Sequence, residues 1–93
     1  MIKFFKCKET KKIFERVFSR KFPEKIQGVA FRKLRMLNRS QTLKDLKVPP
    51  GNRLKALSGD RIGQHSIRIN DQWRICFVWN DGEVNDVEIV NYQ

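Results

Sequence analysis

The chain has 93 residues, and 40% of them are hydrophobic, including ten aromatic side chains. This composition excludes a disordered tail and predicts one folded domain, residues 1–93, with a single modest core. Twenty Lys and Arg against ten Asp and Glu give a formal net charge of +10. Because such an excess attracts polyanions, nucleic acid is the first expected class of partner and an acidic protein the second.

The cysteines and the hydropathy pattern indicate in which cellular compartment the protein is found. Cys7 and Cys76 lie far apart and match no metal-ligand spacing, so we expect free thiols in a reducing compartment, with no metal or cofactor. The opening MIKFFKCKETKK contains no apolar segment typical of a signal peptide, and no run approaches the length of a membrane span. The sequence therefore predicts a cytoplasmic protein without a membrane partner.

The first 22 residues predict a short strand followed by a helix. IKFF, residues 2–5, is typical of a strand, and the period then becomes helical over residues 7–22. Phe22-Pro23 ends that helix, because a residue before proline is pushed out of the α region. The expected buried stripe of the helix holds Ile13, Phe14, Val17 and Phe18.

Residues 23–40 predict a second helix, with Pro23 in its first turn. Its expected buried face holds Ile26, Val29, Ala30, Leu34 and Leu37. Arg32, Arg35 and Arg39 follow an i, i+3, i+7 spacing and share a face of their own. We interpret this face as a solvated basic surface, with contact to RNA phosphates as the alternative.

The rest of the chain predicts strands joined by tight turns, after the loop signal Pro49-Pro50-Gly51-Asn52. Consecutive strands with short turns are antiparallel, and helices between the first strand and the others must cover one face of the sheet. The predicted fold class is therefore α+β, with two N-terminal helices packed on one face of a small, mainly antiparallel, twisted sheet. The other face is left as a working surface.

Alternation along the strands predicts which side chains occupy that free face. In WRICFVW, Trp73, Ile75, Phe77 and Trp79 share one face, and Arg74, Cys76 and Val78 share the other. Arg68 takes the face opposite Ile67 and Ile69 by the same rule. His65 shares the parity of these isoleucines, so we expect a structural or rim histidine, with a catalytic role or contact with RNA as the alternative.

Four short motifs then carry a family likeness: PPGNRL (49–54), LSGD (57–60), SIRIN (66–70) and QWR (72–74). With them, nearly the whole chain resembles the HigB-type branch of the RelE toxin superfamily, including the two helices after the first strand. The resemblance implies a type II toxin that cuts mRNA in the ribosomal A site without a metal and so inhibits translation. It also implies a HigA-like helix-turn-helix antitoxin, the ribosome and mRNA as partners, and operator DNA only through the antitoxin.

Metal-free RNA cleavage has its own requirements. The 2′-hydroxyl attacks the adjacent phosphate, so the site needs a proton acceptor, a proton donor and cations around the transition state. We expect the cations to be Arg53, Lys55, Arg68 and Arg74. Arg74 is the first choice, because it lies in the NDQWR pattern of the family and on the free-face parity.

The C-terminus departs from the family pattern. HigB-type chains commonly end in an Asp-Tyr-His triplet of the active site, whereas this chain reads Asn91-Tyr92-Gln93. At both positions an amide replaces the acid–base group of the family pattern, which keeps the shape of the side chain but removes its capacity to transfer a proton. Tyr92 is retained and is able to stack on a base or to exchange a proton. We expect reduced endoribonuclease activity. An inactive variant that still binds antitoxin and ribosome, and a non-catalytic basic nucleic-acid-binding module, are the alternatives.

Overall fold

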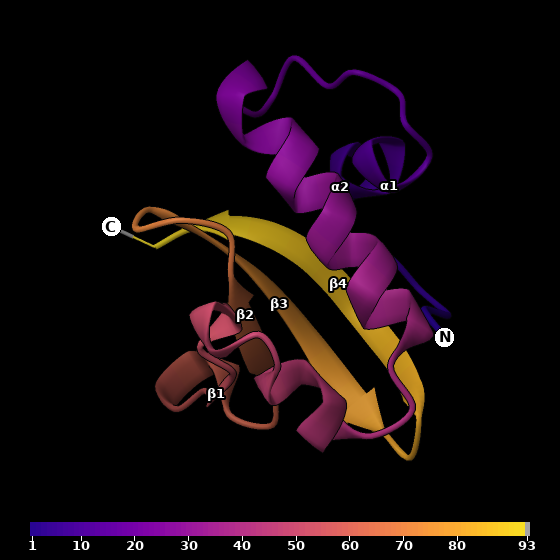
Figure 1. Cartoon of the computed structure of the whole chain (residues 1–93), viewed down its shortest axis with the longest axis vertical. Coiled ribbons are helices and arrows are strands. Elements are labelled where there is room, and N and C mark those ends of the chain that lie inside the picture. Colours follow the sequence, from indigo (N-terminus) through magenta and orange to yellow (C-terminus); the bar gives the residue numbers. More distant parts are fainter. Residues whose placement is uncertain (93) are drawn as a thin grey trace.

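The computed structural model describes residues 1–92, and in this range two helices accompany a four-stranded antiparallel sheet (Figure 1). The strands lie in the order β1-β2-β3-β4, so every neighbour in the sheet is also a neighbour in sequence. This arrangement confirms the predicted α+β class. The elements are α1 (Lys8–Phe14), α2 (Glu24–Arg39), β1 (Lys55–Ala56), β2 (His65–Arg68), β3 (Trp73–Asn80) and β4 (Glu83–Asn91), with 3₁₀ turns at Leu43–Lys47, Pro50–Asn52 and Gly59–Arg61.

The predicted first strand, residues 2–5, makes only isolated bridges. Ile2 and Phe5 lie parallel to Val84 and Val87 of β4, and the Lys3 N–H donates to the Val84 carbonyl at 2.8 Å. The segment therefore runs along the outer edge of β4 without forming a continuous ladder, and it covers backbone groups that an edge strand would otherwise expose.

The first helix is shorter than predicted. It ends at Phe14, and Arg16 takes a positive φ of 64°. The Arg16 N–H donates to the Ile13 carbonyl at 3.0 Å and the Val17 N–H to the Lys12 carbonyl at 2.8 Å, which is the Schellman pattern that ends many helices. The prediction that Val17 and Phe18 continue the buried stripe is wrong, because the chain turns away before it reaches them.

The second helix agrees with its predicted face. Ile26, Ala30, Leu34 and Leu37 are buried and Val29 is half-buried. They pack against the sheet side chains of the helix-facing parity, which include Ile67, Ile75 and Phe77. Trp73 also packs on this core, with its ring edge-on to Phe22 at a centroid distance of 5.7 Å. The odd-numbered side chains of β2 and β3 thus supply the core, as alternation predicts.

The sheet face away from the helices is less open than predicted. Arg74 is only 9% exposed and Cys76 is fully buried. The segment before and after β1 contributes to this burial, because the Arg53 carbonyl bonds to Arg74 and the Arg61 guanidinium lies 3.6 Å from Glu88. A bulge in β4, where Asp86 has φ 53°, shifts the register between Cys76 and Val78 and bends the strand there.

Candidate functional site

Arg74 is the centre of the candidate site. Its Nε donates to the Ser66 hydroxyl at 2.8 Å, and its Nη2 donates to the Arg53 carbonyl at 2.7 Å. The ring of Tyr92 lies 5.6 Å from its Cζ, within cation–π range. Two hydrogen bonds in different directions and an aromatic neighbour hold the guanidinium in one orientation, which is what recognition of a phosphate requires.

Four of the predicted site residues converge here from four segments. Arg53 precedes β1, Arg68 ends β2 as the register partner of Arg74, and Tyr92 follows β4. The Tyr92 N–H donates to the Gln72 carbonyl at 2.6 Å, which anchors this end of the chain beside the turn before β3. The carboxylate of Asp71 accepts from the Arg68 guanidinium.

The local charge is strongly positive. Burial lowers the pKa of the Arg74 guanidinium from its ordinary value, and the charges of Arg68 and Arg53 lower it further. Tyr92 raises the pKa of the Arg74 guanidinium. Arg74 nevertheless stays protonated, because the ordinary pKa of arginine lies far above neutrality. Asp71 pairs with Arg68, and the positive charge of Arg74 and Arg53 favours an anion such as a phosphodiester.

The remaining predicted catalytic residues lie at the edges of this group. Lys55 is exposed on β1 as the register partner of Ser66, whose hydroxyl holds Arg74. Asn91 is exposed and pairs in register with Trp73. Gln93 lies outside the described residues. Strand β2 therefore lies between Lys55 and Arg74, and Asn91 directly precedes Tyr92.

The predicted RNA-contacting residues are more dispersed. Arg32, Arg35 and Arg39 are all exposed on α2, as a solvated basic face predicts, and the Arg35 guanidinium lies 4.9 Å from the ring centre of Phe14. His65 is half-buried on the helix-facing side of β2, stacked on Phe77 at 6.2 Å. It therefore lies on the sheet face opposite Arg74, which agrees with the expected structural role.

Sequence reasoning missed the residues that position Arg53. Asn52 is fully buried, and its Nδ2 donates to the carbonyls of Leu46 at 3.1 Å and Val48 at 3.4 Å. Its Oδ1 accepts from the Lys33 ammonium of α2. Asn52 therefore ties α2 to the loop that ends at Arg53, the residue whose carbonyl holds Arg74. In the sequence, Asn52 belonged to the loop signal and to the PPGNRL motif, but neither indicated its buried contacts, and nothing distinguished Lys33 from its basic neighbours.

We expect Asn52→Ala to lower the free energy of unfolding by about 2–3 kcal/mol, because it leaves two buried carbonyls and one ammonium without their partner. Urea unfolding followed by tryptophan fluorescence measures this change. The exposed Gln41 provides the control, and Gln41→Ala should change stability by less than about 0.5 kcal/mol. Equal stability of the two variants would show that the loop before Arg53 does not depend on Asn52.

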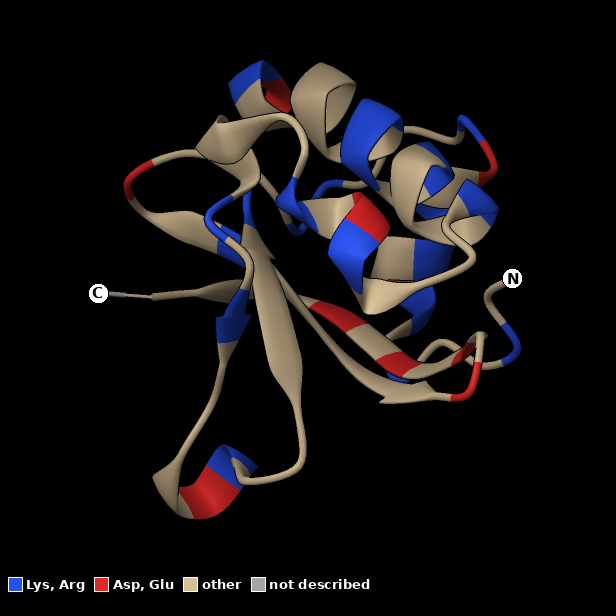
Figure 2. Cartoon of the chain, turned by 60° about the horizontal axis from the view of Figure 1, so that its bottom comes forward, with Lys and Arg blue, Asp and Glu red and all other residues tan. Residues whose placement is uncertain are grey.

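Charge is unevenly distributed around this site (Figure 2). Asp81, Glu83, Asp86 and Glu88 place four of the ten acidic residues on β4 and the turn before it, whereas Lys and Arg predominate on the helices and loops. Lys6 lies 3.3 Å from Glu88, which Arg61 also contacts. Glu88, the acidic residue of β4 nearest Arg74 in register, is thus paired with Lys6 and Arg61.

Across residues 1–92, no group of three or more His, Cys, Asp or Glu side chains is placed to hold a metal ion. No helix within the same range has the length and apolar character needed to cross a membrane.

These features define a class: a small basic α+β protein that gathers arginines and a tyrosine on the sheet face away from its helices. The model of one family matches residues 3–92, almost the whole chain. The chain belongs to this family, the HigB-like toxins, which are RelE-like toxins of type II toxin–antitoxin systems. The resemblance predicted from the sequence motifs is thereby confirmed.

Individual relatives agree with this assignment. Toxin HigB-1 of Vibrio cholerae serotype O1 is 46% identical over 63 residues, which cover 68% of this chain and 66% of that protein. An uncharacterized protein of Haemophilus influenzae is 36% identical over 67 residues, covering 72% of this chain and 66% of that protein. The matches thus span about two thirds of the length of these curated relatives.

A solved structure supports the fold. YafQ from E. coli strain BL21(DE3) superposes with a TM-score of 0.61 at 11% sequence identity, covering 99% of this chain and 92% of that chain. At this identity the likeness concerns the fold alone, and it confirms the predicted arrangement of helices and sheet.

Proposed function

We propose that the chain is the toxin of a type II toxin–antitoxin pair and inhibits translation by cleaving mRNA in the ribosomal A site. The observation that carries the proposal is the fixed guanidinium of Arg74, bonded to Ser66 and to the Arg53 carbonyl and lying beside Tyr92. Arg68 adds a second cation from the neighbouring strand. Family membership supports the reading of this group as an RNA-cleaving site.

The proposed reaction needs only the RNA itself as nucleophile. The 2′-oxygen forms a bond to phosphorus while the bond from phosphorus to the 5′-oxygen breaks. The 2′-proton leaves to an acceptor and the 5′-oxygen gains a proton, so the products are a 2′,3′-cyclic phosphate and a 5′-hydroxyl. In the proposal, Arg74, Arg53 and Arg68 stabilise the negative charge on the phosphorane. Lys55 contributes from the edge of the site.

Tyr92 and the polar residues beside it take the other proposed roles. The exposed ring of Tyr92 provides a surface on which an mRNA base stacks, or a hydroxyl that exchanges a proton. Asn91 and Gln93 position groups, since an amide cannot accept or donate a proton in this way. A HigA-like antitoxin holds the toxin inactive and carries the pair to operator DNA.

One observation favours a second candidate function. Asn91 directly precedes Tyr92, where the resemblance to HigB-type chains implies an acid, so this chain lacks the expected carboxylate. The second candidate is a weakened toxin that binds antitoxin and ribosome but cleaves slowly.

Primer extension on a defined mRNA tests the proposed reaction. With ribosomes present, purified toxin should produce cleavage sites inside the translated region, in register with codons. Without ribosomes, the same mRNA should stay intact. Cleavage that is equal with and without ribosomes would contradict the A-site mechanism, and no cleavage in either case would favour the weakened toxin.

Ribosome binding should depend steeply on salt. If the basic surface makes about four phosphate contacts, the affinity should fall on the order of 10²-fold between about 50 and 200 mM monovalent salt, because binding releases condensed counterions. Sedimentation of the chain with purified ribosomes measures this change. An affinity that is unchanged over this range would show that the net charge of +10 does not drive docking.

A further inference from the structure

Arg68 and Arg74 lie directly opposite each other on neighbouring strands. They are register partners in the antiparallel pair of β2 and β3, so their side chains leave the sheet on the same face, with Cβ atoms about 5 Å apart. Like charges in this arrangement repel each other. Arg74 is held in place by Ser66 and by the Arg53 carbonyl. Arg68 therefore needs a partner of its own to stay beside Arg74.

Asp71, in the turn between β2 and β3, is that partner. Its carboxylate accepts a hydrogen bond from the Nη2 of Arg68. The side chain of Asp71 is 96% exposed and that of Arg68 is 30% exposed, so RNA can reach both. The bond engages one terminal nitrogen, whereas a guanidinium carries five N–H donors. Arg68 can therefore bind Asp71 and a phosphate at the same time.

Hydrogen bonds of Asn70 fix the turn that carries Asp71. The Asn70 Oδ1 accepts from the backbone N–H groups of Gln72 and Trp73, each at 2.8 Å. This is the arrangement of an Asx turn, in which a side-chain oxygen replaces a backbone carbonyl. The N–H groups of Ile69 and Asn70 also donate to the Trp73 carbonyl, at 2.9 and 3.2 Å. Because these bonds come from other residues, the shape of the turn does not require the carboxylate of Asp71.

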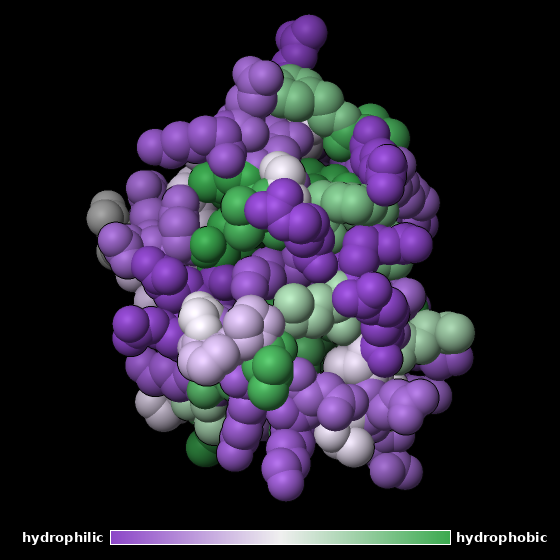
Figure 3. Space-filling view, viewed as in Figure 1, coloured by the Kyte–Doolittle hydropathy of each residue, from purple (hydrophilic) through white to green (hydrophobic). Residues whose placement is uncertain are grey.

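The same turn lies beside the end of β4. The Tyr92 N–H donates to the Gln72 carbonyl at 2.6 Å, and Figure 1 shows the β2–β3 turn, in orange, next to the C-terminal end of β4. Figure 3, seen from the same side, shows hydrophilic side chains along this edge of the molecule. One rigid turn thus connects the two strands that carry the arginines and also anchors the residue with the exposed ring.

We propose that Asp71 is a positioning residue for RNA cleavage, which holds the Arg68 guanidinium beside that of Arg74 so that the two form one clamp for the scissile phosphate. The inference rests on the proposed function, which assigns RNA cleavage to this site. Asp71 stays bonded to Arg68 when the phosphate binds. Two guanidinium groups fixed in this way stabilise the charge of the transition state without reorganising at the moment of reaction.

Single-turnover cleavage of mRNA in ribosome complexes, at saturating toxin, tests the role of the carboxylate through Asp71→Asn. We expect the rate to fall between about 10-fold and 10²-fold, since a misplacement of 1 Å in a site can have an effect of that size. The direction of the change is informative. Loss of a negative charge by itself strengthens the attraction to RNA, so a purely electrostatic role predicts a rate that is equal or higher.

Asp60→Asn is the matched control for charge. Asp60 is exposed in the connection between β1 and β2, at the opposite end of β2 from Arg68. The variant removes the same charge as Asp71→Asn, but the carboxylate that holds Arg68 stays in place. Its cleavage rate should differ from that of the parent by less than about twofold, because exposed charges at a distance are screened by salt.

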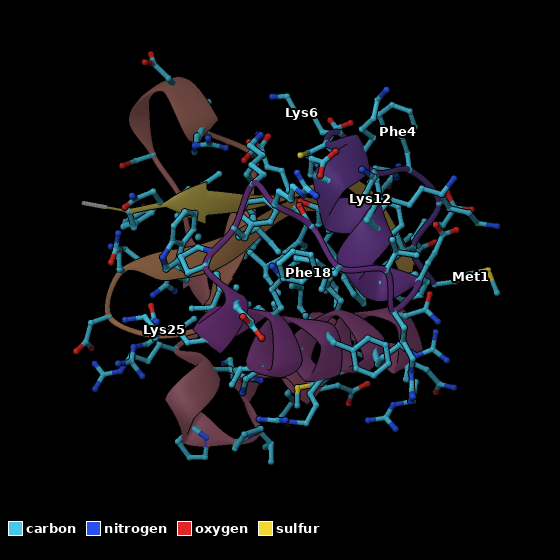
Figure 4. The ribbon with its side chains drawn as sticks, turned by 90° about the horizontal axis from the view of Figure 1, so that it is seen from above. Met1, Phe4, Lys6, Lys12, Phe18 and Lys25 are labelled. Carbon is cyan, nitrogen blue, oxygen red and sulfur yellow. The ribbon has the colours of Figure 1, made fainter. Side chains whose placement is uncertain are left out.

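Arg68→Ala identifies the group through which Asp71 acts. It should lower the rate at least as much as Asp71→Asn, and in its background Asp71→Asn should change the rate by less than about twofold. Asp71→Glu keeps a carboxylate and should recover a large part of the parent rate. Lys25→Ala is the control for Arg68→Ala, because Lys25 is an exposed cation at the start of α2, on the same side of the molecule as the β2–β3 turn (Figure 4). It should cleave at nearly the parent rate.

The fold should tolerate the loss of the carboxylate. An exposed ion pair contributes little to stability, and Asn70 shapes the turn without Asp71. The midpoint of urea unfolding should therefore be the same for Asp71→Asn and the parent. A lower cleavage rate then reflects the geometry of the site and not a loss of folded protein.

Three results would overturn the inference. The parent rate in Asp71→Asn would show that Arg68 does not need the carboxylate, and a higher rate would show that Asp71 competes with RNA for Arg68. An equal loss of rate in the Arg68→Ala background would show that Asp71 acts through another group. Failure of the proposed function is distinguishable, because the parent chain itself would then leave mRNA uncut, and the inference would fall with it.

Discussion

Arg74→Ala is expected to lower the rate of mRNA cleavage by about 10²–10³-fold, the usual effect of removing one preorganised donor from a transition state that gains charge. The Arg74 guanidinium is the most constrained cation of the site, because Ser66 and the Arg53 carbonyl fix it in two directions. Single-turnover cleavage of mRNA in ribosome complexes at saturating toxin measures the chemical step. Ribosome affinity should change much less than the rate.

Arg74→Lys separates charge from geometry. Lysine keeps the charge but has a single terminal nitrogen, so it cannot bond to Ser66 and the Arg53 carbonyl in the way that a planar guanidinium does. We expect most of the loss seen with alanine. Arg20→Ala removes an equal charge from an exposed position and serves as the control. Full cleavage by Arg74→Ala, at unchanged ribosome occupancy, would remove Arg74 from the site.

Stability must be followed in the same variants. Loss of the buried guanidinium leaves the Ser66 hydroxyl and the Arg53 carbonyl unpaired, at a cost of about 1–3 kcal/mol. Ser66→Ala removes one of these bonds and keeps the cation. A smaller loss of rate in Ser66→Ala, with ribosome affinity retained, would identify Ser66 as a positioning residue.

Alternation predicted the faces of the strands correctly where the strands are regular. Ile67, Ile75 and Phe77 supply the core, and Arg68 and Arg74 take the other face, because side chains alternate strictly along an unbroken strand. The motif resemblance added Arg53 and Tyr92, which no periodicity could connect to Arg74.

What the sequence did not predict depends on contacts between distant segments. The burial of Arg74 requires a loop held by Asn52, and that loop is fixed through a bond to α2. The early end of α1 follows from a left-handed conformation at Arg16, and arginine gives no local signal for it. For this reason Val17 and Phe18 lie at the surface, although the sequence analysis placed them in the buried stripe.

The double variant Asn91→Asp, Gln93→His is expected to raise the cleavage rate by about 10²–10⁴-fold, the range that general acid–base catalysis contributes. Both changes restore proton-transfer groups of nearly unchanged shape beside Tyr92. Asn91 lies at the end of β4, in register with Trp73 at the start of the strand that carries Arg74.

The dependence of the cleavage rate on pH shows which proton the introduced imidazole transfers. A histidine at position 93 that accepts the 2′-proton must be neutral, so the rate should rise with pH through about 6.5, the ordinary pKa of histidine. A histidine that protonates the leaving oxygen must be charged, and the rate should then fall over the same interval. The parent chain lacks the imidazole and should show no such step at that pH.

The same double change in an Arg74→Ala background is the decisive control. If the restored groups act on a phosphate that Arg74 stabilises, the two effects depend on each other, and the gain should shrink well below that in the parent. A gain of equal size in both backgrounds would place the restored groups outside the site built around Arg74. No gain in either background would show that Asn91 and Gln93 do not limit the rate of cleavage. The proton acceptor would then be one of the groups already present in the chain. Tyr92→Phe would be the first variant to test for that role.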